Sequence, residues 1–221
     1  MSDYKGTIDF WNGVFKKEMN YDKGEPIPVE EIEKGLNWLA EKSGPIIDFG
    51  CGNGKLVLRS LALGSSKAVG IDISSEAIST ADKLAKDNGL TDKTDFIIGG
   101  VSSLSNFKEN EFDAGIISNV LDNLFPDDAK QLLNHFHRII RQGGRVLLKL
   151  NDYIEPRTLK EWGAKEISDN FYKEDTGLYF WNLTDEEVEN LVSEYFDIER
   201  NARVNYEEYD QVNRLYYLVN R

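Results

Sequence analysis

The chain alternates between short apolar runs and stretches whose apolar residues recur at helical intervals. The runs at 46–49 and 67–72 have the length and composition of strands, and strand and helix alternate through Leu150. After the second run, Ser74 is a candidate N-cap for a helix with apolar residues on one face, and Asn88-Gly89 is a candidate stop. This order predicts a doubly wound α/β fold, with a mostly parallel sheet and helices on both faces. Ligands of such folds bind beyond the carboxyl ends of the strands.

The segment before the first strand, residues 1–44, predicts a helical cover. Ile8, Trp11 and Phe15 fall on one helical face, and the Pro-rich stretch at residues 25–28 then breaks the pattern. Residues 29–42 have the periodicity of a second helix. We expect that second helix to lie on the sheet.

The alternation of strands and helices ends after Leu150. Residues 151–183 hold many aromatic residues among charged ones, which predicts a small inserted cap whose aromatic side chains form either its own core or a wall for a planar substrate. Residues 184–187 are a capping-box pattern that opens a helix, and strand-like segments follow at 196–200 and 215–219. The chain is thus predicted to be one main domain, with a core at 45–150 and a C-terminal part at 184–221 that completes the sheet as an antiparallel hairpin.

Length and composition agree with a compact enzyme domain. The 221 residues are 40% hydrophobic, which suits one core with a small addition. No apolar run approaches the ~18 residues that span a bilayer, and the first residues lack the apolar stretch of a secretion signal. We therefore expect a cytoplasmic protein without a membrane partner.

The ionisable residues exclude some classes of function and disfavour others. A single cysteine excludes an internal disulfide, and with two histidines it provides too few ligands for a usual structural zinc site, so no metal is predicted. The 26 basic and 39 acidic residues give a net charge of −13. Such a surface repels phosphate backbones, and no basic cluster is interleaved with aromatic residues. We therefore expect no nucleic-acid partner.

The first predicted strand ends in a glycine-rich loop with an acid in front of it. Asp48 precedes Gly50, Gly52 and Gly54 in the pattern D-x-G-x-G-x-G, and Lys55 replaces the third glycine of the dinucleotide fingerprint. Glycines allow a sharp turn and a close approach of the backbone to a ligand. A carboxylate at this place repels a pyrophosphate but attracts an ammonium or a sulfonium. The loop therefore favours a cationic mononucleotide-type cofactor.

The second predicted strand ends in Asp72, eighteen residues after Gly54. An acid at the tip of this strand can accept hydrogen bonds from both hydroxyl groups of a ribose. Alone, Asp72 is equally consistent with an ordinary turn acid. Together with the loop, it indicates a nucleoside.

These motifs resemble those of the class I S-adenosylmethionine-dependent methyltransferases. In that family an acidic strand end followed by G-x-G-x-G is the first motif, and the acidic end of the second strand is the next. The resemblance covers residues 45–150 and includes a third strand with its turn at 94–101, a fourth strand at 111–119, and a helix end, turn and fifth strand at 141–148. It implies a seven-stranded sheet that ends in an antiparallel pair, with the seventh strand slotted between the fourth strand and the side of the fifth and sixth.

The resemblance also implies a cofactor, S-adenosylmethionine, and a set of residues that contact it. Many members have an acid where this chain has Gly100, so recognition of the adenine falls to the backbone near Val101 or to Ser102. The N-terminal segment often folds across the cofactor, which suggests Trp11 as a contact. Cys51 lies in the loop, although packing is its simpler role. The candidate cofactor-binding residues are Asp48, Gly50, Cys51, Gly52, Asn53, Asp72, Ile73, Gly100, Val101, Ser118 and Trp11.

Methyl transfer from a sulfonium requires mainly that the two reactants are held in line, so no universal catalytic residue is expected. If the acceptor carries a proton, a base assists, and the candidates by location are Asn119 and Asp122 after the fourth strand and Asp152 or Tyr153 after the fifth. Tyr153 and Arg214 are candidates for the substrate pocket. Arg214 either anchors an anionic acceptor or forms a surface salt bridge.

The leading hypothesis is a methyltransferase, monomeric or homodimeric, that acts on a small-molecule acceptor in a pocket closed by the N-terminal helix and the cap. The alternatives are a protein-directed methyltransferase, a catalytically inert S-adenosylmethionine-binding sensor or partner, and a nicotinamide-dependent oxidoreductase.

Overall fold

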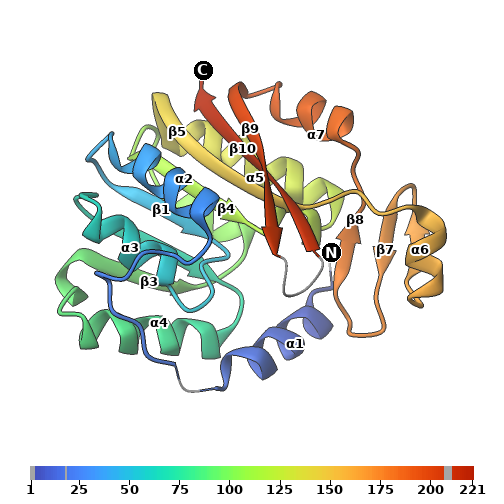
Figure 1. The fold of residues 1–221 in the computed structure, drawn as a ribbon, viewed down its shortest axis with the longest axis horizontal. Helices are drawn as coiled ribbons and strands as arrows, with labels where there is room; N and C mark the ends of the chain where they lie inside the picture. Colours follow the sequence, from blue (N-terminus) through green and yellow to red (C-terminus); the bar gives the residue numbers. More distant parts are fainter. Residues whose placement is uncertain (1–2, 18, 207–210) are drawn as a thin grey trace.

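The computed structural model describes residues 3–17, 19–206 and 211–221. Within them the larger sheet has seven strands in the order β3-β2-β1-β4-β5-β10-β9 (Figure 1). Strands β1 to β5 run parallel to one another, and β10 is antiparallel to both β5 and β9. The strands are β1 (Ile46–Phe49), β2 (Ala68–Asp72), β3 (Thr94–Ile98), β4 (Phe112–Ser118), β5 (Ile140–Asn151), β9 (Phe196–Tyr206) and β10 (Gln211–Asn220).

The predicted fold class is confirmed, with a correction at the C-terminal edge. The last strand, β10, lies between β5 and β9, the fifth and sixth strands of this sheet, and does not touch the fourth strand. The hairpin is also longer than the apolar runs at 196–200 and 215–219 suggest. Backbone pairing continues beyond the buried positions, since half of β9 faces solvent. Residues 141–144, expected as a turn, are part of β5, which bulges where it meets β4.

Helices cover both faces of the sheet. Buried side chains of α5 (Pro126–Ile139) and α7 (Asp185–Val192) belong to the core on one face. Those of α2 (Glu30–Ala40), α3 (Lys55–Ala62) and α4 (Ser75–Asp87) pack on the other. Short 3-10 helices at Thr91–Lys93, Val101–Asn106 and Leu121–Asn123 connect the core elements. None of the helices in the described residues is long and apolar enough to cross a membrane.

The segment between β5 and α7 forms a small unit of its own beside the N-terminal helix (Figure 1). It contains α6 (Pro156–Glu161) and a three-stranded antiparallel sheet of β6 (Lys165–Ser168), β7 (Phe171–Lys173) and β8 (Tyr179–Trp181). The Tyr179 hydroxyl donates to the carbonyl of Asp3 at 3.1 Å, and the backbone of Gly177 abuts that of Gly6. The insertion therefore supports the start of α1 (Lys5–Phe15).

Candidate active site

The loop after β1 adopts a conformation that only glycines accept easily. Gly50, Gly52 and Gly54 have φ values of 76°, 53° and 77°, all in the left-handed region. A Cβ at Gly50 would lie 2.0 Å from Cγ2 of Val120, so this position also leaves no room for a side chain. The amides of Gly50 and Cys51 donate to the carbonyl of Ile71 at 2.7 and 3.0 Å. The first strand end, the second strand end and the segment after β4 thus meet at this loop.

Asp72 holds the loop from the neighbouring strand. Its Oδ2 accepts from the Gly52 amide and its Oδ1 from the Ser74 amide, each at 2.8 Å. The side chain is only 9% exposed, and burial raises its pKa, while the hydrogen bonds from the backbone amides oppose the shift. Each carboxylate oxygen has a further lone pair, so Asp72 can still accept from a ligand. Asp72 also lines a cavity of about 570 Å³.

Asp48 is a buried acid near the end of β1. Its residue is 1% exposed, and neither carboxylate oxygen accepts a hydrogen bond in the part of the chain that the structure describes. Burial, and to a smaller degree the charge of Asp72, raises the pKa of Asp48 to about 8. An unpaired buried charge is costly, and a cation bound nearby would offset that cost. The buried acid at the end of β1 therefore favours a positively charged ligand nearby.

A cavity of about 570 Å³ opens beyond the carboxyl ends of β1, β2 and β4. One part of its wall is the loop after β1, the end of β2 and the turn after β3. The other part comes from α1, the segment after β4 and the first turns of α5. The lining residues are Tyr4, Thr7, Trp11, Phe15, Phe49, Gly50, Gly52, Ile71, Asp72, Ile73, Gly99, Gly100, Val101, Ser102, Ser118, Asn119, Val120, Asn123, Leu124, Asp128 and Gln131.

Helix α1 lies over this cavity and is fixed at both ends. At its start, the Tyr4 hydroxyl donates to Oδ2 of Asp128 at 2.7 Å. Near its end, Oδ1 of Asn12 accepts from the Ser74 hydroxyl at 2.7 Å. The ring of Phe15 lies directly against Gly52 and stacks on Trp11 with a centroid distance of 5.8 Å. The aromatic face of the helix thus lines the cavity on the side of the glycine loop.

The structure brings most of the sequence-predicted residues to this cavity. Those that line it are Trp11, Gly50, Gly52, Asp72, Ile73, Gly100, Val101, Ser118 and Asn119. Cys51 and Asn53 do not: the thiol is 7% exposed and packs in the core, and the amide of Asn53 faces Met19 and the backbone of Lys55. Asp48 lies beneath the loop and not at the cavity surface.

Asp122, predicted as a possible base, is turned away from the cavity. It is fully buried, and its Oδ2 accepts from the backbone amide and the side-chain amide of Asn151, both at 2.9 Å. Its Oδ1 accepts from Nδ2 of Asn123 at 3.2 Å. Asp122 therefore fixes the end of β5, and its expected catalytic role is corrected to a structural one.

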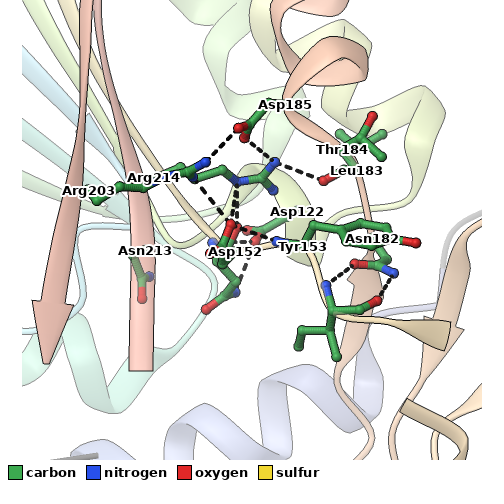
Figure 2. Close-up of polar contacts among 12 residues, drawn as sticks. Asp122, Asp152, Tyr153, Asn182, Leu183, Thr184, Asp185, Arg203, Asn213 and Arg214 are labelled. Carbon is green, nitrogen blue, oxygen red and sulfur yellow. Dashed lines mark hydrogen bonds and ion pairs between the residues drawn. The ribbon is translucent and has the colours of Figure 1, made fainter. Parts of the chain in front are cut away.

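Arg214 and Tyr153, predicted for the substrate pocket, do not line the cavity either. Arg214 is 1% exposed and donates to the carbonyls of Asn151 and Leu183 at 2.9 and 2.8 Å and to Asp185 at 3.2 Å (Figure 2). These partners stand at the two ends of the insertion. Arg214 therefore links the two ends of the insertion, which we call the insertion stems. It forms neither an anion site nor an exposed salt bridge.

Sequence reasoning missed the lining residues Tyr4, Asn123 and Asp128. They come from the start of α1, the segment after β4 and the first turn of α5. Tyr4 and Asp128 are 124 positions apart, so no local pattern connects them. A signal for Asp128 existed in the Pro126-Asp127-Asp128 start of a helix after the fourth strand, because parallel sheets bring such helix starts to the ligand side.

The raised pKa of Asp48 makes a testable prediction about stability. Between about pH 4 and pH 8 the folded protein holds a proton on Asp48 that the unfolded chain releases, so Asp48 lowers stability progressively as the pH rises through this window. Asp48→Asn removes the effect. In urea unfolding, we expect the free energy of unfolding of the variant relative to the wild type to rise by about 2 to 4 kcal/mol from pH 5 to pH 8.

The exposed acid Asp95 in β3 provides the control. Asp95→Asn should leave the difference from the wild type unchanged between the two pH values. An Asp48→Asn difference that is also independent of pH would show that Asp48 is already ionised in the folded protein at pH 5, which contradicts the raised pKa.

Known proteins resemble this chain in sequence, most of all over the segment that holds the glycine loop. A family model described as a methyltransferase domain matches residues 46–144. The ribosomal protein L11 methyltransferase of Haemophilus influenzae is 37% identical over 91 residues, which are 41% of this chain and 30% of that protein. The tRNA N(3)-methylcytidine methyltransferase of Schizosaccharomyces pombe is 24% identical over 204 residues, 87% of this chain and 65% of that one. The chain thus spans less than two thirds of the length of either relative.

Solved structures share the fold over most of the chain. The PH0226 protein of Pyrococcus horikoshii has a TM-score of 0.70 at 24% identity, covering 87% of this chain and 89% of that one. The 1,6-didemethyltoxoflavin-N1-methyltransferase of Burkholderia thailandensis has a TM-score of 0.69 at 17% identity, covering 87% and 79%. That structure holds 1,6-didemethyltoxoflavin and S-adenosylhomocysteine. With the glycine loop, Asp72 and the sheet order, these matches bear out the predicted resemblance: residues 46–144 match a methyltransferase domain, and the chain has the fold of the class I S-adenosylmethionine-dependent methyltransferases.

Proposed function

We propose that this protein transfers a methyl group from S-adenosylmethionine to a small-molecule acceptor that binds under helix α1. The observation that carries the proposal is one continuous cavity of about 570 Å³ with two differently built parts. One part has the glycine loop and Asp72, and the other has polar side chains from α1 and α5. Both reactants can therefore meet inside a single covered space.

The residues of the first part fit the methyl donor. Asp72 is placed for the ribose hydroxyls, and the turn of Gly100, Val101 and Ser102 supplies backbone groups for the adenine. A cation bound at the loop would favour the ionised form of Asp48, whose carboxyl group has no hydrogen-bond partner among the described residues. When bound, the cofactor supplies a methyl group that is activated by its own sulfonium charge.

What the protein adds is position and exclusion of water. Fixing both reactants in near-attack geometry can lower a barrier by about 7 to 11 kcal/mol in the best model systems. Helix α1, anchored through Tyr4 and Asn12, covers the space in which they meet. Asn119 lines this space with a fixed orientation. Its side-chain Oδ1 accepts from Nδ2 of the buried Asn213 at 2.8 Å, and its backbone amide donates to the carbonyl of Lys149. We propose Asn119 as a positioning residue.

A protein acceptor is the second candidate, because the L11 relative is by name a protein methyltransferase and is 37% identical across the matched segment. The covered cavity favours a small molecule, since a protein side chain must enter past α1. The tRNA relative is less similar, and the net charge of −13 opposes a polynucleotide.

Two measurements test the proposal. S-adenosylmethionine and S-adenosylhomocysteine should each raise the melting temperature, and NAD should not. Tritium from labelled S-adenosylmethionine should then appear in the metabolite fraction of an extract and not in its protein or RNA fractions. Label in protein alone would support the second candidate. Cofactor binding without transfer to any fraction would indicate the inert binding protein instead.

A further inference from the structure

The part of the cavity beside α5 has a carboxylate and, among the described residues that line it, no lysine, arginine or histidine. Among the described residues that line the cavity, the only ionisable acids or bases other than Tyr4 are Asp72 and Asp128. Asp72 belongs to the cofactor part, where it already accepts from two backbone amides. Asp128 faces the other part, in the first turn of α5. An anionic acceptor would meet a carboxylate there with no lysine, arginine or histidine to balance it.

The hydrogen bonds around Asp128 leave acceptor atoms for a ligand. Its Oδ2 accepts from the Tyr4 hydroxyl at 2.7 Å, whereas its Oδ1 accepts no hydrogen bond from any residue in the described ranges. Asn123 uses its Nδ2 for the carbonyl of Asn119 and for Asp122, both at 3.2 Å. No residue in the described ranges donates a hydrogen bond to the Oδ1 of Asn123. Two oxygens on the same wall of the cavity can thus receive N–H groups.

The position of Asp128 is fixed before any ligand arrives. The Tyr4 hydroxyl that donates to Asp128 also accepts from the backbone amide of Phe125 at 3.0 Å. The Tyr4 ring packs edge-on against the rings of Phe125 and Tyr179, with centroid distances of 5.4 and 6.3 Å. A preorganised carboxylate gives more selectivity than a mobile one, because binding costs less side-chain entropy.

We propose that the methyl acceptor is a nitrogen compound, an amine or an N–H heterocycle, whose N–H groups bind Asp128 and Asn123. This inference deepens the proposed function and rests on it. In the transfer, the nitrogen lone pair forms the bond to the methyl carbon, the electrons of the carbon–sulfur bond remain on sulfur, and the nitrogen then releases one proton to water. A bound ammonium must lose a proton to water before it can attack.

The test compares nitrogen probes with anionic probes of similar size on protein saturated with S-adenosylhomocysteine. Benzylamine and 2-aminobenzimidazole represent the proposed class, and benzoate and phenyl phosphate represent anions. By calorimetry at pH 7, we expect the best nitrogen probe to bind at least tenfold more tightly than either anion. Asp128→Asn should weaken that probe by roughly tenfold or more, because the hydrogen bond loses its charge.

Asp127→Asn is the matched control, since Asp127 is the exposed neighbour in the same helical turn and does not line the cavity. It removes the same formal charge and should leave the affinity of the nitrogen probe within about twofold. Equal or tighter binding of the anions, no binding of either nitrogen probe, or equal effects of the two variants would overturn the proposal. The titration with S-adenosylhomocysteine itself is read separately: its failure would remove the proposed function, whereas cofactor binding with a preference for anions would remove only the nitrogen acceptor.

Discussion

Replacing Asp72 with alanine is expected to lower the affinity for S-adenosylhomocysteine at least a hundredfold. Two ribose hydroxyls that donate to one carboxylate form charge-assisted hydrogen bonds, each worth about 1.5 to 3 kcal/mol. The same substitution removes the acceptor for the Gly52 and Ser74 amides, so the glycine loop also loses its fixed shape. Calorimetric titration of the folded variant measures the loss, and the thermal shift with the ligand should disappear with it.

Asp72→Asn and Asp95→Ala separate the two contributions. Asparagine keeps one oxygen and the shape of the side chain but no charge, and we expect it to bind between the wild type and Asp72→Ala. Asp95 is an exposed acid of the adjacent strand, paired in register with Val69 of β2, and its removal should leave binding unchanged. An unchanged affinity in Asp72→Ala would mean that the ribose lies elsewhere in the cavity.

The parts of this site that the sequence predicted are local in the chain. The glycine loop can be recognised because each glycine meets a local need, a positive φ value or the absence of a side chain, within five residues of the strand end. Asp72 follows a short apolar run, and the order of strands and helices places both strand ends on one side of the sheet. Short-range rules therefore suffice for the cofactor part.

The part of the cavity between α1 and α5 could not be predicted in the same way, because contacts between residues far apart in the chain form it. Tyr4 meets Asp128 across 124 positions, and Thr7 meets the carbonyl of Gly177 across 170. The same reason explains the wrong expectation for Asp122. Its position after the fourth strand suggests a base, and only the packing of Asn151 against it shows that both carboxylate oxygens are already used.

Arg214 shows how burial reverses the meaning of a residue. In the sequence it is an arginine at the border of a predicted strand, where exposure is the ordinary state. In the structure, β10 lies inside the sheet, between β5 and β9, and this places the side chain in the interior. The guanidinium then has to find its partners in the chain itself, and the insertion stems provide them (Figure 2).

Arg214→Ala is accordingly expected to destabilise the protein by about 3 to 5 kcal/mol in urea unfolding. Truncation leaves the buried carbonyl of Leu183 without its donor and Asp185 without a buried partner, and it creates a cavity as well. Because the lost contacts join Asn151 to Leu183 at the base of the insertion, limited proteolysis should cut the variant first between residues 152 and 182.

Arg203→Ala provides the matched comparison, since Arg203 also contacts Asp185, at 2.5 Å, and contacts Asp152 at 3.2 Å, but its side chain is 46% exposed (Figure 2). An exposed pair of this kind contributes at most about 1 kcal/mol, so this variant should unfold close to the wild type. Similar losses in both variants would mean that charge pairing with Asp185 matters more than the carbonyl contacts of Arg214. A loss confined to Arg214→Ala would instead show that the buried hydrogen bonds hold the insertion, and with it the start of α1, over the cavity.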